Sequence, residues 1–282
     1  MVRTLELRAN GPVDLPATAN LLRNHALPGA ERVADGGRRL ERLLSIGGRP
    51  RHVDLEPTAW GARVTAEADA VDAAAALVRA WLDLDSDVEA IGRSLSVDPL
   101  LAPSVAARPG LRAVRYPEAF EAAVVAVLGQ QVSVAAARTF GGRVVAAFGG
   151  AGEAGLRSFP TPDALLAVPL EELRSAVGVT NARARTVRAV ASAFADGLVL
   201  DPAADLPQQR RALLAIPGIG PWTADYLALR FLGDPDAFPA GDLVLRRALG
   251  GVTTAVADAL SEPWRPHRAH AAFHLWASTG AI

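Results

Sequence analysis

The chain is organised around the stretch Leu213-Leu214-Ala215-Ile216-Pro217-Gly218-Ile219-Gly220-Pro221-Trp222-Thr223-Ala224-Asp225-Tyr226. Residues 206–214 have a helical pattern, and Pro221 suits the first turn of a second helix, where a missing N–H costs nothing. Between these helices, Gly218 and Gly220 let a tight turn take positive φ values and approach a partner closely. The amides of such a turn, together with the N-terminus of the following helix, suit an oxyanion such as a phosphate.

A glycine-capped turn of this kind can serve packing alone, but here two further features accompany it. Trp222 and Tyr226 lie four residues apart on one face of the second helix. About twenty residues after the turn, a spacing on the scale of known motifs, comes Phe238-Pro239-Ala240-Gly241-Asp242-Leu243. Together these stretches resemble the helix-hairpin-helix DNA glycosylase superfamily, and most closely its DNA-3-methyladenine glycosylase II group. The resemblance runs from about Tyr116 to the C-terminus, and more faintly through the N-terminal part.

The length and composition of the chain limit where it acts and how it binds. At 282 residues it is long enough for two domains, and no apolar run reaches membrane-spanning length. The N-terminus lacks the apolar core of a signal peptide, so we expect a cytoplasmic monomer without membrane contact. A net charge of −1 argues against a broad electrostatic grip on nucleic acid. Any DNA contact must therefore rely on directed backbone amides and a few arginines.

Cysteine and lysine are both absent from the chain. Without cysteine, the chain has no disulfides, thiolate zinc sites or iron–sulfur clusters. Without lysine, all 29 basic residues are arginine, and the terminal amine is the one amine that could form a Schiff base. His270 and His274 have the i,i+4 spacing of zinc ligands, but no acid completes a zinc-protease pattern, so we interpret them as structural. No required cofactor is expected.

The periodicity divides the chain into an α+β unit and a helical remainder. Strand patterns cover residues 4–8, 31–34, 39–46, 52–56 and 62–67, and helical patterns cover residues 15–24 and 70–84. They predict an N-terminal antiparallel sheet with two helices on one face over residues 1–105. The acidic run at residues 83–89 is interpreted as a solvated helix end, and residues 98–110 as a linker. Residues 111–282 are predicted to form an all-helical helix-hairpin-helix glycosylase domain.

The resemblance implies a monofunctional DNA glycosylase that excises alkylated purines such as 3-methyladenine from double-stranded DNA. Asp242 matches the catalytic aspartate of the family by its place after the Phe238–Gly241 segment. Breaking an N-glycosidic bond develops positive charge on the deoxyribose, and one well-placed carboxylate stabilises that charge and orients a water. Asp242 also suits the N-cap of a helix predicted at residues 243–249, and the two roles are compatible.

Four side chains are implied to handle the flipped nucleotide. The resemblance places Trp222, Tyr226 and Trp276 around the base, where a cation–π contact of about 0.5–2 kcal/mol would attract a cationic alkylated purine. The alternative for each ring is packing in the helix core. Gln131, in Gly129-Gln130-Gln131-Val132, matches the position that fills the gap in the duplex. Alternatively, both glutamines satisfy backbone groups at a helix end.

Hairpin residues supply the remaining contacts that the resemblance implies. The residues placed against DNA are Gly218, Ile219, Gly220 and Thr223. A monovalent cation held by the backbone carbonyls of Leu214, Ile216 and Ile219 would help to neutralise the phosphate. The arginines at positions 183, 185 and 188 more often mark an exposed helix face than a DNA contact.

Two other functions stay open at this point. A non-catalytic DNA-damage-binding protein would keep the hairpin, but the presence of Asp242 counts against it. An oxidised-base glycosylase with lyase activity would need an amine, and Trp222 stands where lyase-type relatives carry theirs. Gly241 and Leu243 stand where some relatives have a second acid and an aromatic, which leaves the shape of the pocket open.

Overall fold

The computed structural model describes residues 1–280. Its N-terminal part is one antiparallel sheet with the strand order β1-β5-β4-β3-β2. The strands are β1 (Val2–Arg8), β2 (Glu31–Ala34), β3 (Arg39–Ile46), β4 (Arg49–Thr58) and β5 (Gly61–Glu67). The strand register aligns Leu5, Val64, Leu55 and Leu40 in one row across four strands. This row gives the sheet an apolar face that must be covered.

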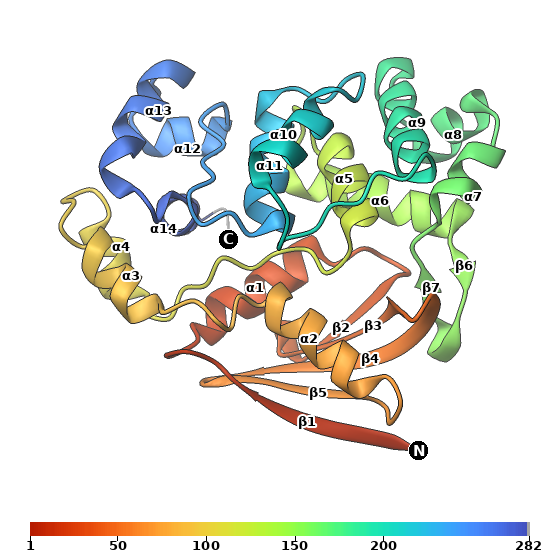
Figure 1. Cartoon of the computed structure of the whole chain (residues 1–282), viewed down its shortest axis with the longest axis horizontal. Helices are drawn as coiled ribbons and strands as arrows, with labels where there is room; N and C mark the ends of the chain where they lie inside the picture. The colour runs from red at the N-terminus through yellow and green to blue at the C-terminus, as the bar shows by residue number, and fades with distance from the viewer. Residues whose placement is uncertain (281–282) are drawn as a thin grey trace.

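Two helices cover that face, as predicted (Figure 1). Helix α1 (Leu15–His25) is capped by Asp14, whose carboxylate accepts a hydrogen bond from the amide of Ala17. Helix α2 (Val71–Trp81) buries Val71, Val78 and Trp81 toward the sheet and α1. The prediction of an α+β fold with an N-terminal antiparallel sheet is therefore confirmed.

The interpretations of residues 83–89 and 98–110 are wrong in part. A further helix, α3 (Val88–Leu95), begins inside the acidic run, because the Asp87 carboxylate caps it by accepting from the amide of Ala90. Asp83 in the same run is only 3% exposed and is not a solvated residue. The expected linker contains helix α4 (Ala102–Ala107), which starts with a proline in its first turn.

The rest of the described chain is helical, as predicted, apart from the short hairpin of β6 (Gly150–Ala151) and β7 (Arg157–Ser158). The helices are α5 (Ala119–Leu128), α6 (Val134–Phe148), α7 (Pro162–Ala167), α8 (Leu170–Val177), α9 (Asn181–Ala195), α10 (Leu206–Leu214), α11 (Pro221–Leu227), α12 (Leu243–Ala248), α13 (Thr254–Ser261) and α14 (Arg268–Ser278). None of the described helices is long and apolar enough to cross a membrane.

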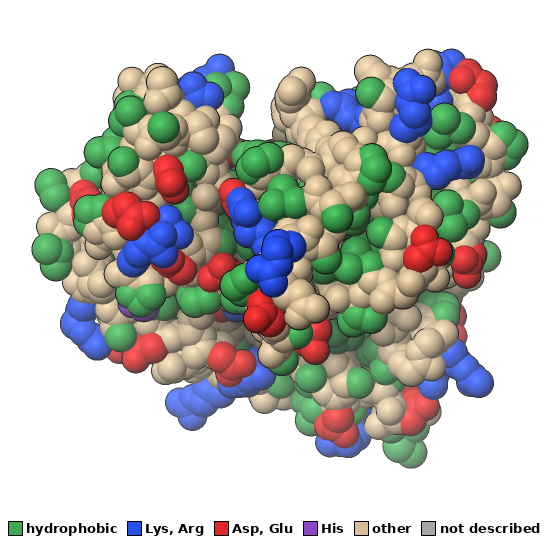
Figure 2. Space-filling model, turned by 45° about the horizontal axis from the view of Figure 1, so that its top comes forward, with side chains coloured by type: hydrophobic (Ala, Val, Ile, Leu, Met, Phe, Trp, Pro, Cys, Tyr) green, Lys and Arg blue, Asp and Glu red, His purple; other side chains and the backbone are tan. Residues whose placement is uncertain are grey.

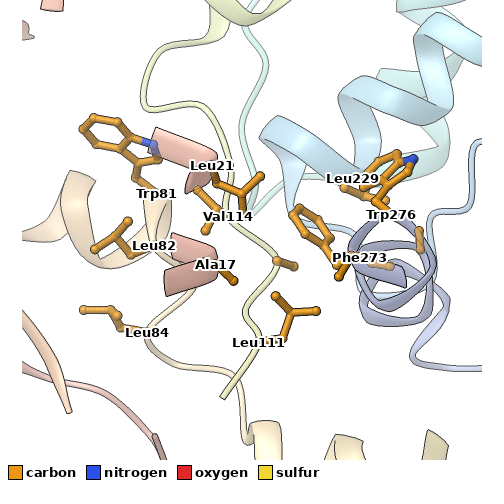
Figure 3. Close-up of a cluster of buried hydrophobic side chains, with 14 of the residues drawn as sticks. Ala17, Leu21, Trp81, Leu82, Leu84, Leu111, Val114, Leu229, Phe273 and Trp276 are labelled. Atoms are coloured by element: carbon orange, nitrogen blue, oxygen red, sulfur yellow. The ribbon is translucent and has the colours of Figure 1, made fainter. Parts of the chain in front are cut away.

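Two hydrophobic cores meet inside this fold. The first runs from the sheet through α1 and α2 to α14, so that Leu21 and Val114 lie between Trp81 and Phe273 (Figure 3). The second is built by α5 to α11. Tyr226 packs against both cores. The N-terminal unit and the last helix therefore share one core, which fixes the position of α14 relative to α11.

The surface is hollowed between the lobe that contains α12 and α13 and the remainder of the helical domain (Figure 2). Arginine and acidic side chains are interspersed on this face rather than gathered into one field. This distribution agrees with the net charge of −1. It leaves shape and local contacts, rather than a broad basic surface, to guide a ligand into the hollow.

Candidate active site

In the turn between α10 and α11, Gly218 has a positive φ and Gly220 does not. Gly218 has a φ of 90°, and a Cβ added there would lie 2.0 Å from the hydroxyl of Thr186. Gly220 has a φ of −100° and is the N-cap of α11. The expectation that both glycines take positive φ is therefore wrong for Gly220, because the first residue before a helix adopts an extended conformation.

Two amides of this turn are free to bind an anion. The amide of Ile219 donates to the carbonyl of Ile216 at 3.0 Å. The amides of Gly218 and Gly220 have no hydrogen-bond partner within residues 1–280. Thr223 is only 2% exposed, and its hydroxyl accepts from Gln130 at 3.0 Å. The Thr223 side chain therefore anchors the hairpin and does not reach the surface.

The loop between α5 and α6 lies against the hairpin. The Gln130 amide group also donates to the carbonyl of Gly218 at 3.1 Å, and Arg183 donates to the carbonyl of Gln130. Gln131 is exposed and has a φ of 57°, which turns it away from the helix that ends before it. The alternative role, hydrogen bonding to backbone groups, therefore applies to Gln130. Gln131 is exposed in the loop.

Asp242 begins α12 and is held entirely by N–H groups. Its Oδ1 accepts from the amides of Val244 and Leu245, each at 2.9 Å, and from the indole of Trp276 at 3.3 Å. Its Oδ2 accepts from the indole of Trp222 at 3.3 Å. Within the described part of the chain, no arginine or histidine forms an ion pair with this carboxylate. The N-cap prediction is confirmed, and four N–H dipoles hold the carboxylate in place.

The three predicted aromatic residues come together around this carboxylate. The rings of Trp222 and Tyr226 are stacked, with centroids 5.3 Å apart and an angle of 23°. The ring of Trp276 meets Tyr226 edge-on at 6.4 Å. All three rings and Asp242 line a mostly apolar cavity of about 190 Å³. A cavity below the range of about 300–1,000 Å³ that suits drug-sized ligands favours a compact, flat guest.

Among the cavity residues that sequence reasoning missed are His25, Tyr116 and Arg230. Burial and the charge of Arg230 lower the pKa of His25 to about 3, so this imidazole is neutral at pH 7. Burial also raises the pKa of the Tyr116 hydroxyl. Arg230 follows Trp222 and Tyr226 at the spacing of one helical face, a signal that could have identified it. No sequence pattern indicates that His25, the last residue of α1, lines the cavity.

The histidines of α14 have structural partners. His270 Nε2 lies 3.1 Å from a carboxylate oxygen of Asp83, and His274 Nδ1 lies 3.1 Å from the hydroxyl of Ser104. Within residues 1–280, no group of three or more histidine, aspartate and glutamate side chains could hold a metal ion. On α9, Arg185 is exposed, whereas Arg188 donates to the carbonyl of Val168.

Comparison with protein families covers most of the chain. Residues 4–120 match the AlkA N-terminal domain. Residues 124–260 match the HhH-GPD superfamily of base excision DNA repair proteins. The second match contains both the hairpin and Asp242, and the first contains the two helices and all of the sheet except residues 2–3.

Individual relatives agree with these families. The chain is 40% identical over 285 residues to a probable bifunctional transcriptional activator/DNA repair enzyme AlkA of Mycobacterium tuberculosis, covering 97% of this chain and 56% of that protein. It is 37% identical over 178 residues to DNA-3-methyladenine glycosylase 2 of Escherichia coli, covering 62% of this chain and 63% of that protein. The chain thus spans about half the length of the mycobacterial relative and under two thirds of the other.

A solved structure has the same fold over nearly the whole length. The 3-methyladenine DNA glycosylase from Archaeoglobus fulgidus superposes with a TM-score of 0.85 at 23% identity, covering 98% of this chain and 97% of that one. At this identity the likeness concerns the fold, including the sheet that precedes the helical domain. The chain belongs to the HhH-GPD superfamily of base excision DNA repair proteins and carries the N-terminal domain of its AlkA members.

Proposed function

We propose that this chain is a DNA glycosylase that removes alkylated purines from double-stranded DNA. The observation that carries the proposal is Asp242, a carboxylate without a cationic partner in the described residues, fixed by Trp222 and Trp276 at an aromatic cavity. The names of the relatives in Mycobacterium tuberculosis and Escherichia coli support this reaction class. A non-catalytic binder would need this carboxylate only as the N-cap of α12, and the two indole contacts would have no role in it. A DNA substrate also favours the bacterial cytoplasm as the place of action.

The reaction is a hydrolysis in which the C1′–N bond of the damaged nucleotide breaks. The electron pair of that bond leaves with the base, and positive charge develops on the sugar, where Asp242 stabilises it. A water adds to C1′ and its proton passes to the solvent, so that a cationic nucleotide yields an abasic site and the neutral free base. The rings of Trp222, Tyr226 and Trp276 hold the flipped base by stacking and cation–π contact.

Binding to DNA is assigned to the turn and to the loop beside it. The free amides of Gly218 and Gly220 would hold a backbone phosphate, and Gln131 would fill the gap left by the flipped nucleotide. A monovalent cation on the carbonyls of Leu214, Ile216 and Ile219 would strengthen the phosphate contact. The Ile216 carbonyl already accepts from the Ile219 amide, but a carbonyl has a second lone pair.

The same proposal includes hydrolysis without lyase activity, carried out by a monomer. The chain contains no lysine, and the indole of Trp222 occupies the hydrogen-bonding position beside Asp242. We expect intact abasic strands that nick only after alkaline or heat treatment. Borohydride should trap no covalent complex, and trapping on a side chain would contradict this part of the proposal.

One assay tests the central claim. The protein is incubated with methylated duplex DNA, and the released bases are separated by chromatography. Release of 3-methyladenine is expected from the wild-type chain, and Asp242→Asn should abolish nearly all of it. Binding of abasic-site DNA without release of any base would favour the non-catalytic alternative.

A further inference from the structure

Arg230 is a buried cation in the wall of the cavity without a carboxylate to pair with. Its side chain is only 3% exposed. Within residues 1–280, its hydrogen bonds reach the Tyr226 hydroxyl and the His25 ring, both at 3.4 Å, and its Nε has no partner. An unpaired buried charge is costly, and a structural arginine is normally saturated with acceptors. The guanidinium therefore keeps unused donor capacity, and Arg230 is one of the residues that line the cavity.

Nearby carboxylates do not neutralise this charge. Glu31 and Glu121 line a second cavity of about 20 Å³ that also touches Arg230. Both carboxylates bind Arg42 instead, each with a contact of 2.7 Å. Because Arg42 already holds these two groups, the guanidinium of Arg230 is the less neutralised of the two cations.

Aromatic rings rather than anions surround the Arg230 guanidinium. Its central carbon lies 5.0 Å from the ring centroid of Tyr116, 5.7 Å from that of Tyr226 and 5.6 Å from that of Phe273. Arg230 sits in the π-helical turn Ala228–Leu232, a type of distortion that recurs at functional sites. A cation against the Tyr226 ring already uses its π electrons, which weakens the attraction of that ring for a cationic base.

Three charged side chains line the cavity: the exposed Arg138, whose Nε donates to the carbonyl of Ala26, and two inner groups of opposite sign, Asp242 and the buried Arg230. Asp242 contacts Trp222 and Trp276, both rings contact Tyr226, and Tyr226 contacts Arg230. Heterolysis of a glycosidic bond in a neutral nucleotide separates charge in the same sense, with a sugar cation and a base anion. The electron pair of the broken bond moves into the ring nitrogens and the carbonyl oxygen of a base such as hypoxanthine. An N–H donor at that oxygen would stabilise the departing anion until it takes up a proton.

A cationic alkylated purine behaves differently, because it leaves as a neutral molecule. It gains nothing from a cation in the wall and is repelled by it while bound. We propose that Arg230 is a specificity-determining residue that extends the pocket to neutral, carbonyl-bearing purines, with hypoxanthine as the simplest case, at the expense of cationic ones. This inference rests on the glycosylase function proposed above.

The test compares two bases in single-turnover excision. One substrate is a duplex oligonucleotide with a single hypoxanthine, and the other is methylated duplex DNA that releases 3-methyladenine. In Arg230→Met, hypoxanthine excision relative to 3-methyladenine should fall at least about tenfold, since a donor to a developing charge is lost. In Arg230→Lys this ratio should fall less, because lysine keeps the positive charge but lacks the planar guanidinium. Arg49→Met, an exposed position on β4, is the matched control and should keep the wild-type ratio.

A second readout separates this inference from the function on which it rests. Binding of free hypoxanthine can be followed by tryptophan fluorescence, because Trp222 and Trp276 line the cavity. The dissociation constant should rise at least about tenfold in Arg230→Met and stay constant in Arg49→Met. If the wild-type chain released neither base, the proposed glycosylase function would fail, and the binding comparison would still test Arg230. An unchanged excision ratio, or unchanged hypoxanthine affinity, in a folded Arg230 variant would reduce Arg230 to a packing residue.

Discussion

Two aspartates of this molecule differ in how their charge is balanced. Asp83 is buried and accepts from His270 at 3.1 Å, Arg115 at 2.9 Å, Ser86 at 2.7 Å and the amide of Ala113 at 3.2 Å. Burial alone would raise the pKa of Asp83. The hydrogen bond from His270 and the charge of Arg115 outweigh burial and hold this pKa below its ordinary value. This carboxylate ties the N-terminal unit to α14.

Asp242 receives as many hydrogen bonds, but all of them come from uncharged donors. Its negative potential is therefore directed into the cavity instead of being cancelled locally. The same contrast separates Arg42, which holds three glutamates, from Arg230, which holds none within residues 1–280. Where a buried charge has its counter-charge, it stabilises the fold; where it lacks one beside a cavity, it is available to a ligand.

The largest effect is expected when the balanced aspartate loses its charge. Asp83→Asn leaves Arg115 without its counter-ion and should cost about 3–5 kcal/mol of unfolding free energy, measured by urea denaturation. Asparagine tolerates the φ of 54° at this position, so backbone strain does not contribute. Excision per folded molecule should stay near wild type. Because the pKa of Asp83 is depressed, the difference from wild type should persist at pH 7 and shrink only in strong acid.

The same substitution at the unbalanced aspartate should have the opposite profile. Asp242→Asn keeps a good N-cap but removes the charge that faces the sugar cation. The excision rate should fall about 10²–10³-fold or more, while the unfolding free energy changes by less than about 1 kcal/mol. Single-turnover excision and urea denaturation on one preparation measure both quantities. A variant that melts early yet excises normally would make Asp242 a cap only, and the comparison with Asp83 would collapse.

The sequence predicted the parts of this contrast that are local in the chain. The hairpin, the Asp242 cap and the aromatic pair Trp222 and Tyr226 are all readable from short motifs. Charge balance is not local, because the partners of Asp83 include His270, which is 187 positions away. No residue near position 83 in the sequence indicates that His270 will pack against it. The acidic run was therefore interpreted as solvated.

The cavity wall shows a similar limit. Arg230 belongs to the helical face of Trp222 and Tyr226, but its lack of a carboxylate is visible only once α1 and α14 are packed around it. His25 comes from the N-terminal unit and needs the shared core to reach the cavity. Helix α3 was missed for a simpler reason, since Asp87 was counted as part of an acidic run and not as a cap.

The crowded cluster around Arg42 should reveal itself by its pH dependence. Burial, against the opposing charge of Arg42, raises the pKa of Glu31 to about 7 from its ordinary 4.5. A raised acidic pKa contributes stability that is present below pH 4.5 and lost as the pH rises through about 7. Glutamine does not ionise, so Glu31→Gln does not lose this stability as the pH rises. The unfolding free energy of the variant minus that of the wild type should therefore increase by roughly 1–3 kcal/mol between pH 4.5 and about 7.

Urea denaturation of the wild type and Glu31→Gln at several pH values between 4.5 and 8 measures this difference. The pKa values of His25 and His274 are lowered to about 3 and about 4, so these residues make the protein less stable as the pH falls. This contribution to the unfolding free energy is the same in both proteins and cancels in the comparison. Glu153→Gln, at an exposed position, is the control and should follow the wild type at every pH. A constant offset for Glu31→Gln would mean that Glu31 is ionised throughout, and that the Arg42 cluster is fully charged.

Neighbouring glutamines repeat the contrast between satisfied and free groups on the smallest scale. Gln130 is bonded to Gly218 and Thr223, whereas Gln131 is exposed. Gln131→Ala should weaken binding to abasic-site DNA a few-fold, about the value of one hydrogen bond, and leave undamaged duplex nearly unaffected. Alanine adds no strain at the φ of 57°, since both residues carry a Cβ. Gln130→Ala should instead weaken both complexes equally, because it loosens the hairpin. Fluorescence anisotropy with the two duplexes measures all four affinities, and equal losses for both DNAs in Gln131→Ala would move the gap-filling role to another side chain.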